Sequence, residues 1–225
     1  MKRTYLIAVG IAVWALVAAL TQAAPQYWDT DAGAGIQGGN AAWSATDANW
    51  SDTRAGTALS AWGSGNNALF VAPADGFPSI VTLTNSLSVG SVSISTGGLH
   101  TLIVTNGGQM LAGSGASVIG YLASNNTVII VGGVGVTSLW EVGTGVATQA
   151  LTIGSGAGAT NNLLVIDGGG IPSAAVVSNV SVVIVGSAAG SQRNTLIVTN
   201  GGKLFSKSIC AIGSTSPNNT TRVTG

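Results

Sequence analysis

Charge is the scarcest property of this 225-residue sequence, because Asp, Glu, Lys and Arg together make up 6% of it, where about 25% is ordinary. Between Gly76 and Gln192 the only formal charges are Glu141 and Asp167. A nucleic-acid-binding surface needs a stripe of basic residues, and a polybasic membrane patch needs a cluster of them. The sequence therefore excludes nucleic acids and anionic membrane surfaces as partners.

Cysteine and histidine are almost absent as well, with one of each, Cys210 and His100. One thiol cannot form a disulfide within the chain, and one histidine with one cysteine cannot build a zinc site. Cys210 lies in the apolar run SICAIG, so we interpret it as a small core residue. We expect no metal and no cofactor, so that stability comes from packing and from ladders of hydrogen bonds.

Candidate catalytic groups are equally sparse. A glycoside hydrolase needs two carboxylates about 5–10 Å apart, and the repeat region offers only Glu141 and Asp167, about one repeat apart. Asp167 falls in the turn of LLVIDGGG, where a structural turn role is favoured. A serine triad would have to use His100, which we interpret as a strand-edge residue, and no nucleophile elbow with a suitable acid accompanies it. We therefore predict that the chain is not an enzyme.

The first 23 residues have the pattern of a signal peptide. Lys2 and Arg3 form a basic start, residues 6–20 are almost all apolar, and small residues precede a cleavage point after Ala23. A retained membrane anchor is the disfavoured alternative, because this apolar run is shorter than the roughly 20 residues that span a bilayer. We assign residues 1–23 to a signal peptide and expect an exported protein with no transmembrane segment after its removal.

Glycine is abundant, and it marks an internal repeat. The octapeptide TLIVTNGG occurs at 101–108 and again at 195–202. A looser unit surrounds it, in which an Ile-Gly or Val-Gly step precedes an Asn or a His that opens a β-rich run. The glycines of these steps stand at positions 90, 120, 154, 186 and 213. A drifting period near 30 residues, built of short strands and turns, is typical of a stacked repeat architecture.

We predict an all-β fold, a right-handed parallel β-helix with five repeat units over residues 79–225, since no segment keeps a helical period without an interrupting Gly, Pro or Asn. Asparagine tolerates left-handed backbone, and its amide can bond to the same amide one coil further on. We therefore expect asparagine ladders at the bends, formed by Asn126, Asn162, Asn194 and Asn219. A β-sandwich is the alternative, because short strands at regular spacing are typical of it too.

Residues 24–78 differ in composition from the repeats and hold four tryptophans, Trp28, Trp43, Trp50 and Trp62. We expect this segment to cap the first coil, where an open sheet edge would invite association. The alternative is that the same four rings form a platform for a carbohydrate.

The cap segment carries a recognisable motif: WD, a glycine-rich spacer, W, NW, W and A-x-F. It consists here of Trp28-Asp29, Trp43, Asn49-Trp50, Trp62 and Ala68-x-Phe70. This order resembles the amino-terminal leader of bacterial surface proteins with autotransporter-associated β-strand repeats and of exported repeat proteins with a PEP-CTERM sorting tail. The rhythm NNT-x-x-VTG at 218–225 is similar to the repeats that follow such leaders.

The resemblance implies a β-helical passenger on the outer cell surface of a Gram-negative bacterium, with a structural or adhesin-like role and no catalytic activity. Such a passenger would contact host-cell, matrix or glycan surfaces, and its coil ends could self-associate. The sequence departs from the family, because it shows neither a carboxy-terminal translocator barrel nor a sorting tail, and we expect a fragment of a longer protein. The alternatives are a carbohydrate-binding or polysaccharide-degrading exoprotein that uses the tryptophans and a passive spacer for a module beyond residue 225.

Overall fold

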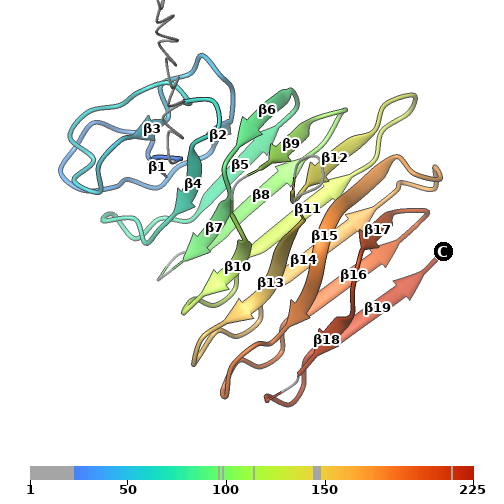
Figure 1. Cartoon of the computed structure of the whole chain (residues 1–225). Helices are drawn as coiled ribbons and strands as arrows, with labels where there is room; N and C mark the ends of the chain where they lie inside the picture. Colours follow the sequence, from blue (N-terminus) through green and yellow to red (C-terminus); the bar gives the residue numbers. More distant parts are fainter. Residues whose placement is uncertain (1–22, 96, 98, 114, 144–147, 214) are drawn as a thin grey trace, which may run out of the picture.

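The computed structural model describes residues 23–95, 97, 99–113, 115–143, 148–213 and 215–225. The assignment of a signal peptide to residues 1–23 thus lies outside the described residues, apart from Ala23. Every regular secondary-structure element in the described ranges is a β-strand, and these ranges contain no helix. The prediction of an all-β fold is confirmed, and the strands form two sheets (Figure 1).

One sheet has seven strands in the order β19-β16-β14-β11-β8-β5-β2. These strands are β2 (Ala41–Ala42), β5 (Ser79–Leu83), β8 (His100–Val104), β11 (Thr127–Val131), β14 (Leu163–Asp167), β16 (Thr195–Thr199) and β19 (Thr220–Thr224). Every adjacent pair is parallel. The two copies of TLIVTNGG supply β8 and β16, which lie in this same sheet with β11 and β14 between them. The sandwich alternative requires antiparallel sheets, whereas the strands of this sheet are parallel.

The other sheet has twelve strands and is also largely parallel. Its strands are β1 (Pro25–Trp28), β3 (Trp50–Ser51), β4 (Asn67–Phe70), β6 (Ser86–Val89), β7 (Val92–Ser95), β9 (Gln109–Ala112), β10 (Ser117–Tyr121), β12 (Ser138–Glu141), β13 (Gln149–Ser155), β15 (Ala175–Val185), β17 (Lys203–Ser206) and β18 (Cys210–Ile212). Ten of them follow the order β3-β1-β4-β7-β10-β13-β15-β12-β9-β6, and β17 and β18 both pair with β15. The long strand β15 curls the sheet, because its first part pairs with β12 and its last part with β13.

The strands form because apolar and polar positions alternate with a period of two. In β8 the side chains of Leu102 and Val104 are buried, whereas those of Thr101 and Ile103 are only partly covered. The inward positions of the next strands hold Val128, Ile130, Leu164, Ile166, Leu196 and Val198, all of them buried. Parallel pairing in register stacks these side chains on one another, and burying each one contributes roughly 1.5–3 kcal/mol.

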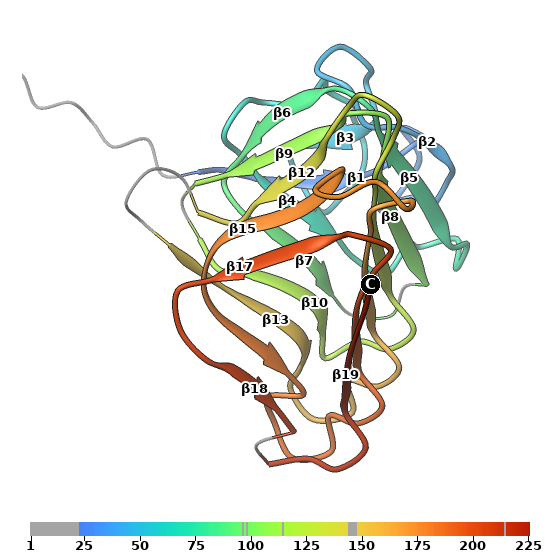
Figure 2. The ribbon, with the colours of Figure 1, turned by 90° about the vertical axis from the view of Figure 1, so that its right-hand side faces the viewer.

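The strands follow the chain order from one end of the molecule to the other, as the colours of Figure 1 show. Residues 24–78, called the cap below, hold β1 to β4 and lie at one end. The cap continues both sheets, because β4 pairs with β7 and β2 pairs with β5. At the opposite end the outermost strands are β17, β18 and β19, which face the viewer in Figure 2.

Candidate functional site

Four asparagines form a hydrogen-bonded column at one bend of the chain, each immediately before a strand of the seven-stranded sheet. The side-chain Nδ2 of Asn126 donates to Oδ1 of Asn162 at 3.0 Å. In the same way Asn162 donates to Asn194 at 2.9 Å, and Asn194 donates to Asn219 at 3.1 Å. The backbone N–H of each of the first three asparagines donates to that same acceptor at 3.0–3.2 Å. The column therefore includes the four asparagines that the sequence places at bends.

The residue before each column position adopts the left-handed conformation that asparagine tolerates. Asn125, Asn161 and Asn218 have φ of 61°, 56° and 63°, and Arg193 holds the equivalent position before Asn194 with φ of 55°. At each bend the first residue, an asparagine at three bends and Arg193 at the fourth, turns the backbone. The second residue is the column asparagine, whose side chain hydrogen-bonds to the neighbouring repeat.

Sequence reasoning noted the Ile-Gly and Val-Gly steps but missed their partner in space. Gly120, Gly154 and Gly186 have φ of 81°, 76° and 77°. A Cβ at Gly154 would lie 2.2–2.5 Å from the amide atoms of Asn194, and the other two glycines face Asn162 and Asn219 just as closely. The glycine is needed because the asparagine amide of the following repeat occupies the space of a side chain.

The four cap tryptophans pack into one aromatic cluster with Phe70. Ring centroids are 4.6 Å apart for Trp50 and Trp62 and 4.9 Å apart for Trp43 and Trp50. The centroid of Trp28 lies 5.3 Å from that of Trp50 in an edge-on arrangement. All four side chains are at most 6% exposed. A carbohydrate platform requires an exposed ring face, and in this cluster the four rings cover one another.

The three residues weighed for catalysis have separate structural partners. His100 is buried, its Nε2 donates to the Val71 carbonyl at 3.0 Å, and burial lowers its pKa. Glu141 accepts a hydrogen bond from Asn179 Nδ2. Asp167 accepts one from the Gly169 N–H at 2.8 Å and one from Asn200 Nδ2 at 3.0 Å, as a turn residue does. Within the described ranges no three His, Cys, Asp or Glu residues come together to hold a metal ion.

Asp29, which belongs to the leader motif, is a fully buried carboxylate in the cap. Its Oδ1 accepts hydrogen bonds from the backbone N–H of Gln37 at 3.0 Å and of Asp31 at 3.4 Å. Its Oδ2 has no hydrogen-bond partner among the described residues. Burial is the main cause that raises the Asp29 pKa, and the nearby charges of Asp31 and Asp75 act in the same direction.

The interpretation of Cys210 as a core residue is wrong, because its side chain is exposed. In the register of β15 and β18, Cys210 pairs with the buried Val183 and so occupies an inward-facing position. It is exposed because no further strand covers it in the described part of the chain. The local alternation of the sequence predicts the inward direction of the Cys210 side chain, but its exposure depends on whether another strand covers it.

The outward side of the seven-stranded sheet is regular and nearly uncharged. Its central row is Ile103, Ile129, Val165 and Ile197, and one flanking row is Thr101, Thr127, Leu163 and Thr195. These side chains are partly exposed. In-register pairing spaces each row by about 4.8 Å, and β-branched side chains have few rotamers, so the rows form a stiff surface.

No family model, curated protein or solved structure matches this chain. Nor do the described residues include a helix with the length and apolar character needed to cross a membrane.

Proposed function

We propose that the chain is a right-handed parallel β-helix that serves as an exported, non-catalytic surface scaffold of the adhesin-like kind. The observation that supports it most is the unbroken series of in-register parallel pairs between successive repeats. Thr101 pairs with Thr127, Thr127 with Leu163, and Leu163 with Thr195. A connection that returns to a parallel neighbour in the same sheet is right-handed in about 98% of cases, which favours the right-handed form.

A scaffold fits these residues better than an enzyme does. The column asparagines hydrogen-bond to one another, and His100 donates its backbone N–H to Asn126 and its Nε2 to the Val71 carbonyl. Glu141 and Asp167 accept hydrogen bonds from neighbouring amides. Stacked repeats of this kind offer an extended surface as their product. The resemblance of the cap motif to autotransporter-associated repeat proteins supports export and display on a Gram-negative cell surface.

The outward rows of the seven-stranded sheet are the surface we propose for attachment to host-cell, matrix or glycan surfaces. They combine methyl groups with hydroxyl groups and carry little charge, so contact would rest on shape and hydrogen bonding. Screening by salt acts on charge pairs and would weaken such attachment only slightly.

Attachment of the purified exported chain to cells and to glycan-coated surfaces tests this role. The double variant Ile129→Lys with Ile197→Lys introduces two charges in the central row and should abolish attachment. The matched control is Ser93→Lys with Val118→Lys. These two residues are partly exposed and pair with each other on neighbouring strands of the twelve-stranded sheet, so this variant should attach like the unaltered chain. Equal loss in both double variants, or no attachment of the unaltered chain, would remove the adhesive role.

A further inference from the structure

A surface groove of about 420 Å³ lies where the cap joins the seven-stranded sheet. One wall is residues 38–40, which lead into β2, and the other is Phe77, Pro78 and Ile80, which lead into and begin β5. The walls lie side by side because β2 pairs with β5 (Figure 1). Small-molecule sites have volumes of about 300–1,000 Å³ and combine apolar walls with a few fixed polar groups. The groove has the volume of such a site.

The apolar wall of the groove carries an exposed aromatic ring. Phe77 is 66% exposed, whereas the rings of the aromatic cluster are buried. The loop of Phe77 is tied to the opposite wall, because the Asp75 carboxylate accepts hydrogen bonds from the Phe77 N–H at 3.0 Å and from the Gly38 N–H at 3.1 Å. A Cβ at Gly38 would lie 2.3 Å from the Phe77 carbonyl oxygen, so the two backbones are in close contact. The ring is therefore held by a fixed loop, which lowers the entropy cost of binding to it.

The polar group of the groove is the side-chain amide of Asn40. Its Oδ1 accepts a hydrogen bond from the Ile80 N–H at 2.8 Å, which fixes the amide plane. Its Nδ2 has no acceptor among the described residues, and the side chain is exposed. An amide nitrogen carries two N–H donors. Asn40 thus presents oriented donors next to the apolar wall.

The charges around the groove disfavour an anionic ligand. Asp75 joins the two walls, and Asp75 and Asp31 both lie close enough to Asp29 to raise its pKa. The cap contains five Asp, and Arg54 is its only basic residue. Carboxylate and sulfate groups are repelled from such a surface. Both Asp75 oxygens already accept a backbone N–H, which favours a neutral ligand over one that needs an ion pair.

We infer that the groove binds a neutral sugar residue of a glycan. One side of a pyranose ring presents C–H groups that pack on an aromatic ring, and its hydroxyl oxygens accept hydrogen bonds from amide donors. Phe77 and Asn40 supply these two contacts in one groove. Ile80 pairs with Thr101 of the flanking row, so the groove continues the attachment surface proposed above. The inference rests on that proposed function for the choice of glycans, and it adds the ligand class and a site.

Calorimetric titration of the exported chain with soluble oligosaccharides tests the inference. The probes are neutral hexasaccharides of glucose, of mannose and of N-acetylglucosamine, with the galacturonic acid hexasaccharide as the anionic counterpart. We expect a neutral probe to bind with a Kd of about 1 mM or less, and the anionic probe not to bind.

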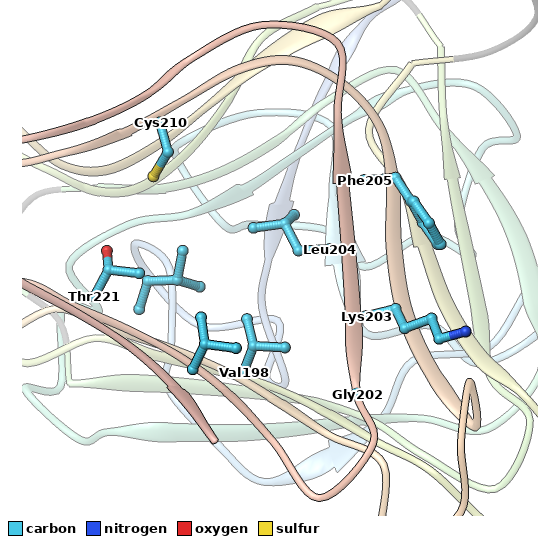
Figure 3. A pocket seen from close by; sticks show the side chains of 9 residues that line it. Val198, Gly202, Lys203, Leu204, Phe205, Cys210 and Thr221 are labelled. Atoms are coloured by element: carbon cyan, nitrogen blue, oxygen red, sulfur yellow. The ribbon is translucent and has the colours of Figure 1, made fainter. Parts of the chain in front are cut away.

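Two substitutions in the groove should each weaken that binding at least about tenfold. Phe77→Ala removes the ring, and Asn40→Asp keeps the acceptor for the Ile80 N–H but removes the donors. The matched control is Phe205→Ala, which removes another exposed phenylalanine from the separate apolar groove of Figure 3 and should leave binding unaltered. Circular dichroism and melting verify that all three variants are folded.

The inference is overturned if no neutral probe binds, if the anionic probe binds equally well, or if Phe77→Ala and Phe205→Ala have equal effects. The proposed attachment role fails separately. A chain that attaches to cells but binds no neutral probe would lose the groove inference alone. A chain that binds a neutral probe through Phe77 but attaches to no surface would lose the adhesive role and keep the sugar site.

Discussion

The substitution Asn162→Ala tests the asparagine column at its centre. Asn162 Oδ1 accepts hydrogen bonds from the Asn126 N–H at 3.2 Å and from Asn126 Nδ2 at 3.0 Å. Its Nδ2 donates to the Ala123 carbonyl at 2.8 Å and to Asn194 Oδ1 at 2.9 Å. Alanine removes all four bonds in a site that excludes water.

Two of the partner groups have no replacement, the Asn126 N–H and the Ala123 carbonyl. Each buried group left without a partner costs about 1–3 kcal/mol, so the free energy of unfolding should fall by about 3–4 kcal/mol. For a protein of this size about 1 kcal/mol shifts Tm by about 2–4 °C, which predicts a loss of about 10 °C. Thermal unfolding followed by circular dichroism and by tryptophan fluorescence measures the shift.

The matched control is Asn161→Gly at the adjacent residue. Asn161 is exposed, has φ of 56°, and donates its side-chain amide to Asn125 at the surface. Glycine accepts the same backbone conformation, so we expect a loss below about 1 kcal/mol. Equal and small Tm shifts for Asn162→Ala and Asn161→Gly would refute the view that the buried column holds the repeats together.

Three further substitutions probe the column and the cap. Gly154→Ala places a Cβ 2.2–2.5 Å from the Asn194 amide and should lower the free energy of unfolding in urea by at least about 3 kcal/mol. The control is Gly158→Ala, where φ is 79° and the space is open, and it should lower that free energy by only about 1 kcal/mol. Burial raises the Asp29 pKa, so the stability that Asp29 contributes is full below about pH 3.9 and is lost as pH rises through its folded pKa. Asp29→Asn should raise Tm at pH 7 and flatten the dependence of Tm on pH. An unchanged profile of Tm against pH would contradict this prediction. Burial lowers the His100 pKa, so the stability that neutral His100 contributes is present above about pH 6.5 and is lost as pH falls toward the folded pKa. In melting experiments at several pH values, His100→Asn should remove this loss of stability in acid. The amide of the new side chain should extend the asparagine column from Asn126.

Much of the fold could be predicted because its signals are local. Alternation in runs such as TLIVT predicts a strand with one buried side. The Asn-Asn pairs combine a left-handed turn residue with a buried amide, and both properties follow from the chemistry of asparagine. Each unit has its asparagine at the bend that opens the β-rich run, so the column residues Asn126, Asn162, Asn194 and Asn219 could be named from the sequence although the period drifts.

Other features depend on residues that are far apart in the chain. Gly186 must lack a side chain because the Asn219 amide lies against it, and only the register between neighbouring repeats reveals that contact. The burial of Asp29 depends on the loop around Gln37, and the exposure of Cys210 depends on the lack of a covering strand in the described residues. The sequence shows the density of the tryptophans, but whether their faces are open depends on how the cap folds over them.

The central claim, that successive repeats lie on one another as turns of one coil, is tested most directly by distances between spin labels on the seven-stranded sheet. Ile80 and Thr220 are separated by five strand spacings, and Thr101 and Thr195 by three. With Cys210→Ser as background, we expect separations near about 24 Å and about 14 Å, a difference of about 10 Å. Equal separations for the two pairs, or a shorter one for the outer pair, would contradict the stacked-coil account.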